Sequence, residues 1–194
     1  MLDDPFTRAR TAALMIALVA ALSFWPVSAE IASAEGPDDA NLTTRFNYLS
    51  QHGNVQCSVQ FENSIKLMPS DAKLEGSCCA PMDEARYRQQ LDGLKKYSDI
   101  AEVPPDPYDI PAPLALQLMS YYDMALNKEE QAAYDYAMEH SDMEGPCCCK
   151  CWRWKVYGGL GKYLIHTRHF TGQQLTDLWN VGQGCGGPID TKMH

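Results

Sequence analysis

The chain has 194 residues, a formal net charge of −9, 45% hydrophobic residues and eight cysteines. Its length suits one domain with a full hydrophobic core, and its acidic balance argues against nucleic acid as a partner and against electrostatic attachment to anionic lipid. No segment resembles a hydrolase triad, a phosphate-binding loop or a haem-attachment motif. A binding or structural protein is therefore expected ahead of an enzyme.

Residues 1–29 have the organisation of an export signal peptide. Arg8 and Arg10 precede an apolar run from Ala12 to Trp25, and residues 27–29 are small, as a signal peptidase requires. The apolar run is short for a membrane span, which needs about 20 apolar residues. Cleavage is therefore the expectation and retention as an N-terminal anchor the alternative. The mature protein is expected to be secreted, periplasmic or part of the cell envelope, without a membrane span.

Residues 30–44 contain a run of Asp, Asn and Thr and predict a disordered leader, which leaves residues 45–194 as a single Cys-rich helical domain. From Val55 to Phe61, apolar and polar residues alternate as in a half-buried strand. The spacing of Cys57 and Ile65 fits a helix equally well. Both interpretations remain open, and a strand here has no clear partner in the sequence.

Most of the remaining chain has helical periodicity. Apolar residues at helical spacing predict helices at residues 83–97, 114–126, 128–140, 156–164 and 172–181. Asn127 and Glu130 have the spacing of a capping box, and the same spacing separates Thr171 from Gln174. Three glycines within residues 158–161 lower helix propensity by about 1 kcal/mol each, which predicts close approach of another helix.

Residues 101–113 contain five prolines. Such a segment is typically extended and polyproline-like, and it predicts a connector that wraps over the domain surface. The fold class expected from all these segments is mainly α: a small helical bundle with an extended Pro-rich connector and a Cys-rich loop or helix start.

The Cys-rich segment runs from Gly145 to Trp154. It places four thiols within five positions, at Cys147, Cys148, Cys149 and Cys151. Adjacent cysteines rarely bridge each other, because a disulfide needs Cα atoms about 4.4–6.8 Å apart in a specific orientation. A soft metal ion is the usual shared partner, and thiolates select ions such as Cu(I) and Zn(II). Arg153 and Lys155 add positive charge that favours thiolates.

Two backbone conformations of this segment would bring three sulfurs together. If a helix begins at Pro146, Cys147 and Cys148 lie in its first turn, where the macrodipole favours thiolates. Cys151 then shares a face with these two cysteines. In an extended chain, Cys149 takes the place of Cys148 in the converging set. Three sulfurs suffice for a trigonal Cu(I) site or for most of a tetrahedral Zn(II) site.

Four cysteines outside the segment are further candidates. Cys185 follows a predicted helix that returns the chain by about 16 Å toward the Cys-rich segment, so it is the expected fourth sulfur. Cys78 and Cys79 lie in a turn and could complete the metal site. Alternatively, one of this pair forms a disulfide with Cys57.

Other soft or borderline donors receive a weaker prediction. His140 and Met143 lie just before the thiols and would suit copper, or they are an exposed loop histidine and a packed methionine. His166 and His169 have the spacing of two ligands on one helix. A straight helix would put His166 about 22 Å from Cys151. These two histidines are therefore expected to be a surface pair or a separate weak site.

The Cys-rich segment resembles the motif of the PCYCGC family of exported bacterial proteins, on Pro146, Cys147, Cys149 and Cys151. Cys148 stands in place of the motif's tyrosine and Lys150 in place of its glycine, and a late cysteine such as Cys185 is also similar. The resemblance implies an exported protein, with metal binding as the expected role. The cysteines at 57, 78 and 79 have no counterpart in the motif.

Three functions compete on this evidence. The first is an exported protein that binds copper or zinc through a thiolate cluster, for storage, delivery or detoxification. The second is a structural or accessory subunit of a cell-envelope complex, held together by up to four disulfides and with a protein partner in the envelope. The third is a thiol-disulfide oxidoreductase that uses Cys148 and Cys151 as its Cys-x-x-Cys pair, although no βαβ context surrounds them.

Overall fold

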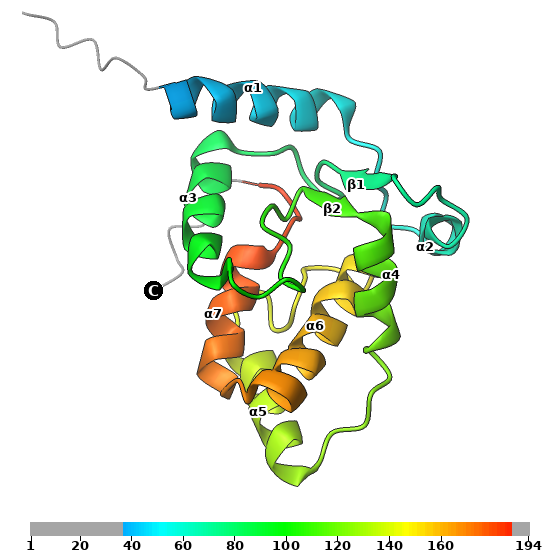
Figure 1. The fold of residues 1–194 in the computed structure, drawn as a ribbon, viewed down its shortest axis with the longest axis vertical. Helices are drawn as coiled ribbons and strands as arrows, with labels where there is room; N and C mark the ends of the chain where they lie inside the picture. The colour runs from blue at the N-terminus through cyan, green and yellow to red at the C-terminus, as the bar shows by residue number, and fades with distance from the viewer. Residues whose placement is uncertain (1–36, 188–194) are drawn as a thin grey trace, which may run out of the picture. The chain divides into compact units, whose positions relative to one another are not determined.

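The computed structural model describes residues 37–187, which belong to one compact unit of the chain, Glu35–His194. The expected signal peptide, residues 1–29, lies outside the described residues. The described part contains seven α-helices, one 3₁₀ helix and a two-stranded sheet, so the fold is mainly α, as predicted (Figure 1). The elements are α1 (Pro37–His52), α2 (Val59–Ile65), β1 (Lys73–Glu75), α3 (Glu84–Leu94), η1 (Lys95–Tyr97), β2 (Asp109–Pro111), α4 (Ala112–Ser120), α5 (Lys128–His140), α6 (Trp152–Arg168) and α7 (Gly172–Gly182). Within residues 37–187, every helix is too short or too polar to cross a membrane.

Helix α1 corrects the prediction of a disordered leader over residues 37–44, which are helical. The sequence of α1 is polar, and its tertiary contacts explain its order. Leu49 is buried, and Arg45 forms ion pairs with Asp106, at 3.0 Å, and with Asp109. These contacts reach about 60 positions along the chain, so no local pattern could reveal them.

The ambiguous segment becomes helical only at Val59, and residues 55–58 form neither a helix nor a strand. In α2, the Ser58 side chain accepts a hydrogen bond from the Phe61 amide and caps the helix. The strands lie elsewhere, in β1 and β2, which pair antiparallel with Leu74 opposite Ile110. Each strand has three residues. Such short strands carry too few residues for a period-two pattern to be recognised.

The Pro-rich segment runs through the interior, which corrects the prediction that it wraps over the surface. Val103 and Tyr108 are buried, as is Asp106. The Tyr87 hydroxyl donates to Asp106 at 2.7 Å, and Tyr108 donates to Gln90 at 3.0 Å. Hydrogen bonds to these polar groups compensate for their loss of water, so the segment can join the core.

The C-terminal half follows the predicted helix order. Asn127 with Glu130 forms a capping box at the start of α5, and Thr171 with Gln174 forms another at the start of α7, as predicted. Helix α4 differs from the prediction, because it spans Ala112–Ser120 instead of residues 114–126.

The glycines of α6 allow another helix to approach closely, as predicted. Figure 1 shows α4 beside α6. A Cβ at Gly159 would overlap the carbonyl oxygen of Leu118 in α4 and would lie 3.0 Å from its carbonyl carbon. The contact between the two backbones therefore depends on the missing side chain, which explains a residue that is otherwise unfavourable in a helix.

Candidate metal centre

The Cys-rich segment is a loop, so of the two conformations that the sequence left open the helix start at Pro146 does not form. Helix α6 begins at Trp152, with Cys151 as its N-cap residue. Gly145 has a φ of +139°, and its amide donates to the Ser141 hydroxyl at 2.7 Å. A Cβ at Gly145 would lie 2.5 Å from the Trp154 ring. The turn at Gly145 thus sends the chain away from α5 in a conformation that favours glycine.

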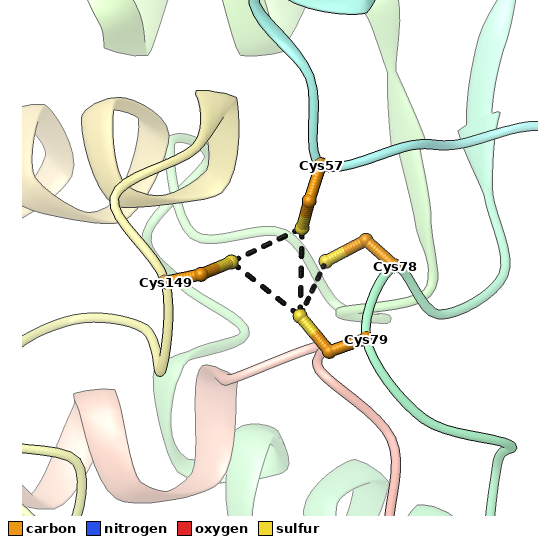
Figure 2. Close-up of side chains that lie close together, drawn as sticks. All are labelled: Cys57, Cys78, Cys79 and Cys149. Atoms are coloured by element: carbon orange, nitrogen blue, oxygen red, sulfur yellow. Dashed lines mark hydrogen bonds between the residues drawn. The ribbon is translucent and has the colours of Figure 1, made fainter.

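Four chain segments deliver sulfur atoms to one place. Cys57 precedes α2, Cys78 and Cys79 lie between β1 and α3, the Cys-rich loop precedes α6, and Cys185 follows α7. Figure 2 shows Cys57, Cys78, Cys79 and Cys149 pointing toward one another from three of these segments. The Sγ of Cys149 lies 3.1 Å from that of Cys57 and 3.4 Å from that of Cys79.

The remaining sulfurs extend this group into a network of all eight cysteines. Cys79 also contacts Cys57 at 3.4 Å, Cys78 at 3.6 Å and Cys148 at 3.4 Å. Cys151 lies 3.4 Å from Cys149, and Cys185 lies 2.9 Å from Cys147. Helix α7 therefore returns Cys185 to the Cys-rich loop, in the way its predicted length required. None of the eight is in a disulfide.

The distances between these sulfurs distinguish two kinds of chemistry. A disulfide has an S–S length of about 2.05 Å. Two sulfurs that bind one tetrahedral ion with bonds of about 2.3 Å lie about 3.8 Å apart. Except for Cys147 and Cys185, the contacts of 3.1–3.6 Å are closer to the second value. Sulfurs at these distances are compatible with the ligands of a shared ion and are too far apart to be bridged pairs.

Exposure changes across the network. Cys57, Cys79 and Cys148 are exposed, Cys78 and Cys149 are half-buried, and Cys147, Cys151 and Cys185 are buried. A cavity of about 240 Å³ opens beside the network and is lined by Cys57, Ser58, Val59, Glu62, Cys149, Lys150 and Cys151. Solvent therefore reaches one side of the sulfurs, while the protein interior encloses the other.

The thiols differ in how readily they lose a proton. A hydrogen bond from Cys147 lowers the pKa of Cys185 and that of Cys78, each to about 5, against the opposing effect of burial. Burial, supported by neighbouring thiols, raises the pKa of Cys57 and Cys79. The thiols of Cys57 and Cys79 therefore resist ionisation without a nearby cation. A bound metal ion would supply that positive charge, since a coordinating thiol is deprotonated outright.

Arg153 is a buried positive charge that interacts electrostatically with the thiols of Cys78, Cys185 and Cys147. Its side chain is fully buried, and its guanidinium donates to the carbonyl oxygens of Pro107 and, at 2.7 Å, Gly76. Burial acts to lower its pKa, but the charges of Cys78 and other thiols outweigh burial and raise it. The described residues show no carboxylate ion-paired with Arg153. A buried cation needs a counter-charge, and the thiolates are the anions at hand.

The other cation predicted to act on the thiols is engaged elsewhere, because Lys155 pairs with Glu62 at 2.5 Å. The sequence predicts a different role for Cys57, as a disulfide partner of Cys78 or Cys79. The structure places it beside this pair, 3.4 Å from Cys79 and without a disulfide. The same four-sulfur group also contains Cys149, 92 positions away. Local spacing carries no signal for a contact of that separation.

The three histidines among the weaker candidates do not join the sulfurs in the described part of the chain. His166 contacts Glu130 at 3.0 Å, His140 contacts the carbonyl oxygen of Tyr136 at 2.8 Å, and His169 is the C-terminal cap of α6. The groups of donor atoms that lie within 4.8 Å of one another contain only cysteines. Met143 is half-buried.

Comparison with known proteins gives no family for this chain. No family model matches it, and no match emerges among the curated proteins or the solved structures. The chemistry of the sulfur network is therefore the basis on which a function can be assigned.

Proposed function

We propose that this protein binds a soft metal ion outside the cytoplasm, Cu(I) ahead of Zn(II), through its cysteine network, and serves in metal storage, delivery or detoxification. The observation that carries the proposal is the gathering of eight unbridged sulfurs from four segments. Packing does not account for this arrangement, since Cys57, Cys79 and Cys148 are exposed. The export signal expected at residues 1–29 and the resemblance to the PCYCGC family support an extracytoplasmic location. The signal and the family relationship are themselves part of this proposal.

The donor set favours a soft ion. All the donors are sulfur, and thiolates select Cu(I) and Zn(II) over hard cations such as Mg²⁺ or Ca²⁺. One group has four sulfurs, which suits a tetrahedral ion. Two others have three sulfurs, and Cu(I) accepts three ligands more readily than Zn(II) does.

A metal and thiol analysis of the exported protein tests this proposal. The full chain is expressed with export, purified without oxygen and divided for elemental mass spectrometry and for thiol counting after denaturation and chelation. Bound copper or zinc with eight free thiols is expected. A matched variant, Cys79→Ser with Cys149→Ser, should lose metal, whereas His166→Ala should keep it. A metal-free protein that contains four disulfides would refute the proposal.

A second function is favoured by one observation. The buried sulfurs of Cys147 and Cys185, at 2.9 Å, come nearest to disulfide distance. A disulfide here would support a structural or accessory subunit, and the same thiol count detects it. The oxidoreductase alternative has less support. The two cysteines of the Cys-x-x-Cys pair each contact a different cysteine, because Cys148 contacts Cys79 and Cys151 contacts Cys149. They therefore do not form an isolated dithiol.

A further inference from the structure

The sulfur groups that could each hold an ion overlap in a specific way. Three groups have all their sulfurs within 4.8 Å of one another: Cys57, Cys78, Cys79 and Cys149; Cys79, Cys148 and Cys185; and Cys147, Cys148 and Cys149. The first and second groups share Cys79, the second and third share Cys148, and the third and first share Cys149. Every pair of groups therefore has one sulfur in common.

This overlap closes a ring. If each group binds one ion, each shared sulfur bridges two ions, and metal and sulfur alternate around a six-membered ring. The unshared sulfurs are terminal ligands: Cys57 and Cys78 on the first ion, Cys185 on the second and Cys147 on the third. Cys151 lies outside the three groups, although it contacts Cys149 at 3.4 Å.

Ligand number favours monovalent Cu(I) in this ring, and the surroundings offset part of the charge that then remains. Two of the three positions have three sulfurs, fewer than the four that a structural Zn(II) site requires. Each Cu(I) that binds displaces protons from thiols to the solvent and keeps its oxidation state, so no oxidant or reductant is needed. Seven thiolates with three monovalent ions leave a net negative charge. Arg153 offsets part of it on the buried side, and water solvates the exposed sulfurs of Cys79 and Cys148.

We propose that the network binds three Cu(I) ions in a single ring bridged by Cys79, Cys148 and Cys149. This inference rests on the proposed function and adds the number of ions, their class and the bridging sulfurs. Because neighbouring ions share sulfurs, the first ion orders the ligands of the next, and loading is cooperative. The competing arrangement is two separate tetrahedral ions with four cysteines each, which share no sulfur and fill independently.

The test is an anaerobic titration of the reduced full chain with Cu(I), buffered by a chromophoric Cu(I) chelator and followed by native mass spectrometry. The metal-free and three-ion forms should dominate throughout the titration. X-ray absorption of the loaded protein should show copper–copper scattering, because ions that share a sulfur at about 2.3 Å lie no more than ~4.6 Å apart.

Two single variants locate the bridges. Cys148→Ser removes an exposed sulfur, so the fold should be preserved, but two of the groups drop to two donors, the ring opens and the three-ion form should be lost. His140→Ala is the control, because this histidine contacts the Tyr136 carbonyl and belongs to none of the sulfur groups, and it should still load three ions. Any other stoichiometry, absence of copper–copper scattering, or three ions in Cys148→Ser would overturn the ring while leaving the proposed function intact. Failure of the wild-type chain to bind Cu(I) or Zn(II) would overturn both.

Discussion

If the network binds metal as proposed, removal of the metal should destabilise the folded protein by about 4–5 kcal/mol, because the ions would cross-link distant parts of the chain. The cluster connects Cys57 with Cys149, 92 positions apart. A cross-link across a loop of about this length lowers the entropy of the unfolded chain by an amount worth about 4.6 kcal/mol at 25 °C. For a unit of this size, each kcal/mol corresponds to roughly 2–4 °C, so the midpoint of thermal unfolding should fall by about 10–20 °C.

The assay is thermal unfolding followed by circular dichroism, under reducing and oxygen-free conditions, on metal-loaded protein and on protein treated with a strong chelator. The double variant Cys79→Ser with Cys149→Ser is the control, because it removes two of the shared sulfurs and should show little difference between the two states. Equal unfolding midpoints for the loaded and metal-free wild type would refute the reasoning. An undiminished metal effect in the double variant would refute it as well.

Two further predictions concern the scaffold and a third concerns His166. In a urea titration, Gly159→Ala should lower the free energy of unfolding by about 1–3 kcal/mol, because the added methyl group forces α4 away from α6. Gly158→Ala is the control and should lower it less, because its added methyl group meets aromatic side chains that can move. Asn127→Ala removes a capping box and should cost about 1 kcal/mol in that titration with no change in metal content. His166→Ala breaks an exposed contact with Glu130, so a competition assay should give unchanged metal affinity; a tenfold loss would place this histidine at the metal.

The sequence by itself determined the features that depend on residues close together in the chain. Helix periodicity and side-chain caps act within one or two turns, so the capping boxes at Asn127 and Thr171 and the order of the later helices could be predicted. The crowding of thiols between Cys147 and Cys151 likewise indicated shared chemistry before any fold was known. The glycines of α6 predicted a close helix contact, because glycine lowers helix propensity and such a contact can offset that cost.

Only the tertiary structure decided how distant segments meet. Helix α1 is polar and forms because Arg45 and Leu49 find partners far along the chain, and the Pro-rich segment is buried because its carboxylates are hydrogen-bonded there. The contact between Cys57 and Cys149 and the overlap of the three sulfur groups also depend on segments that are far apart in the sequence. Such contacts depend on the path of the whole backbone. Packing interactions throughout the core stabilise this path, so no local sequence pattern predicts it.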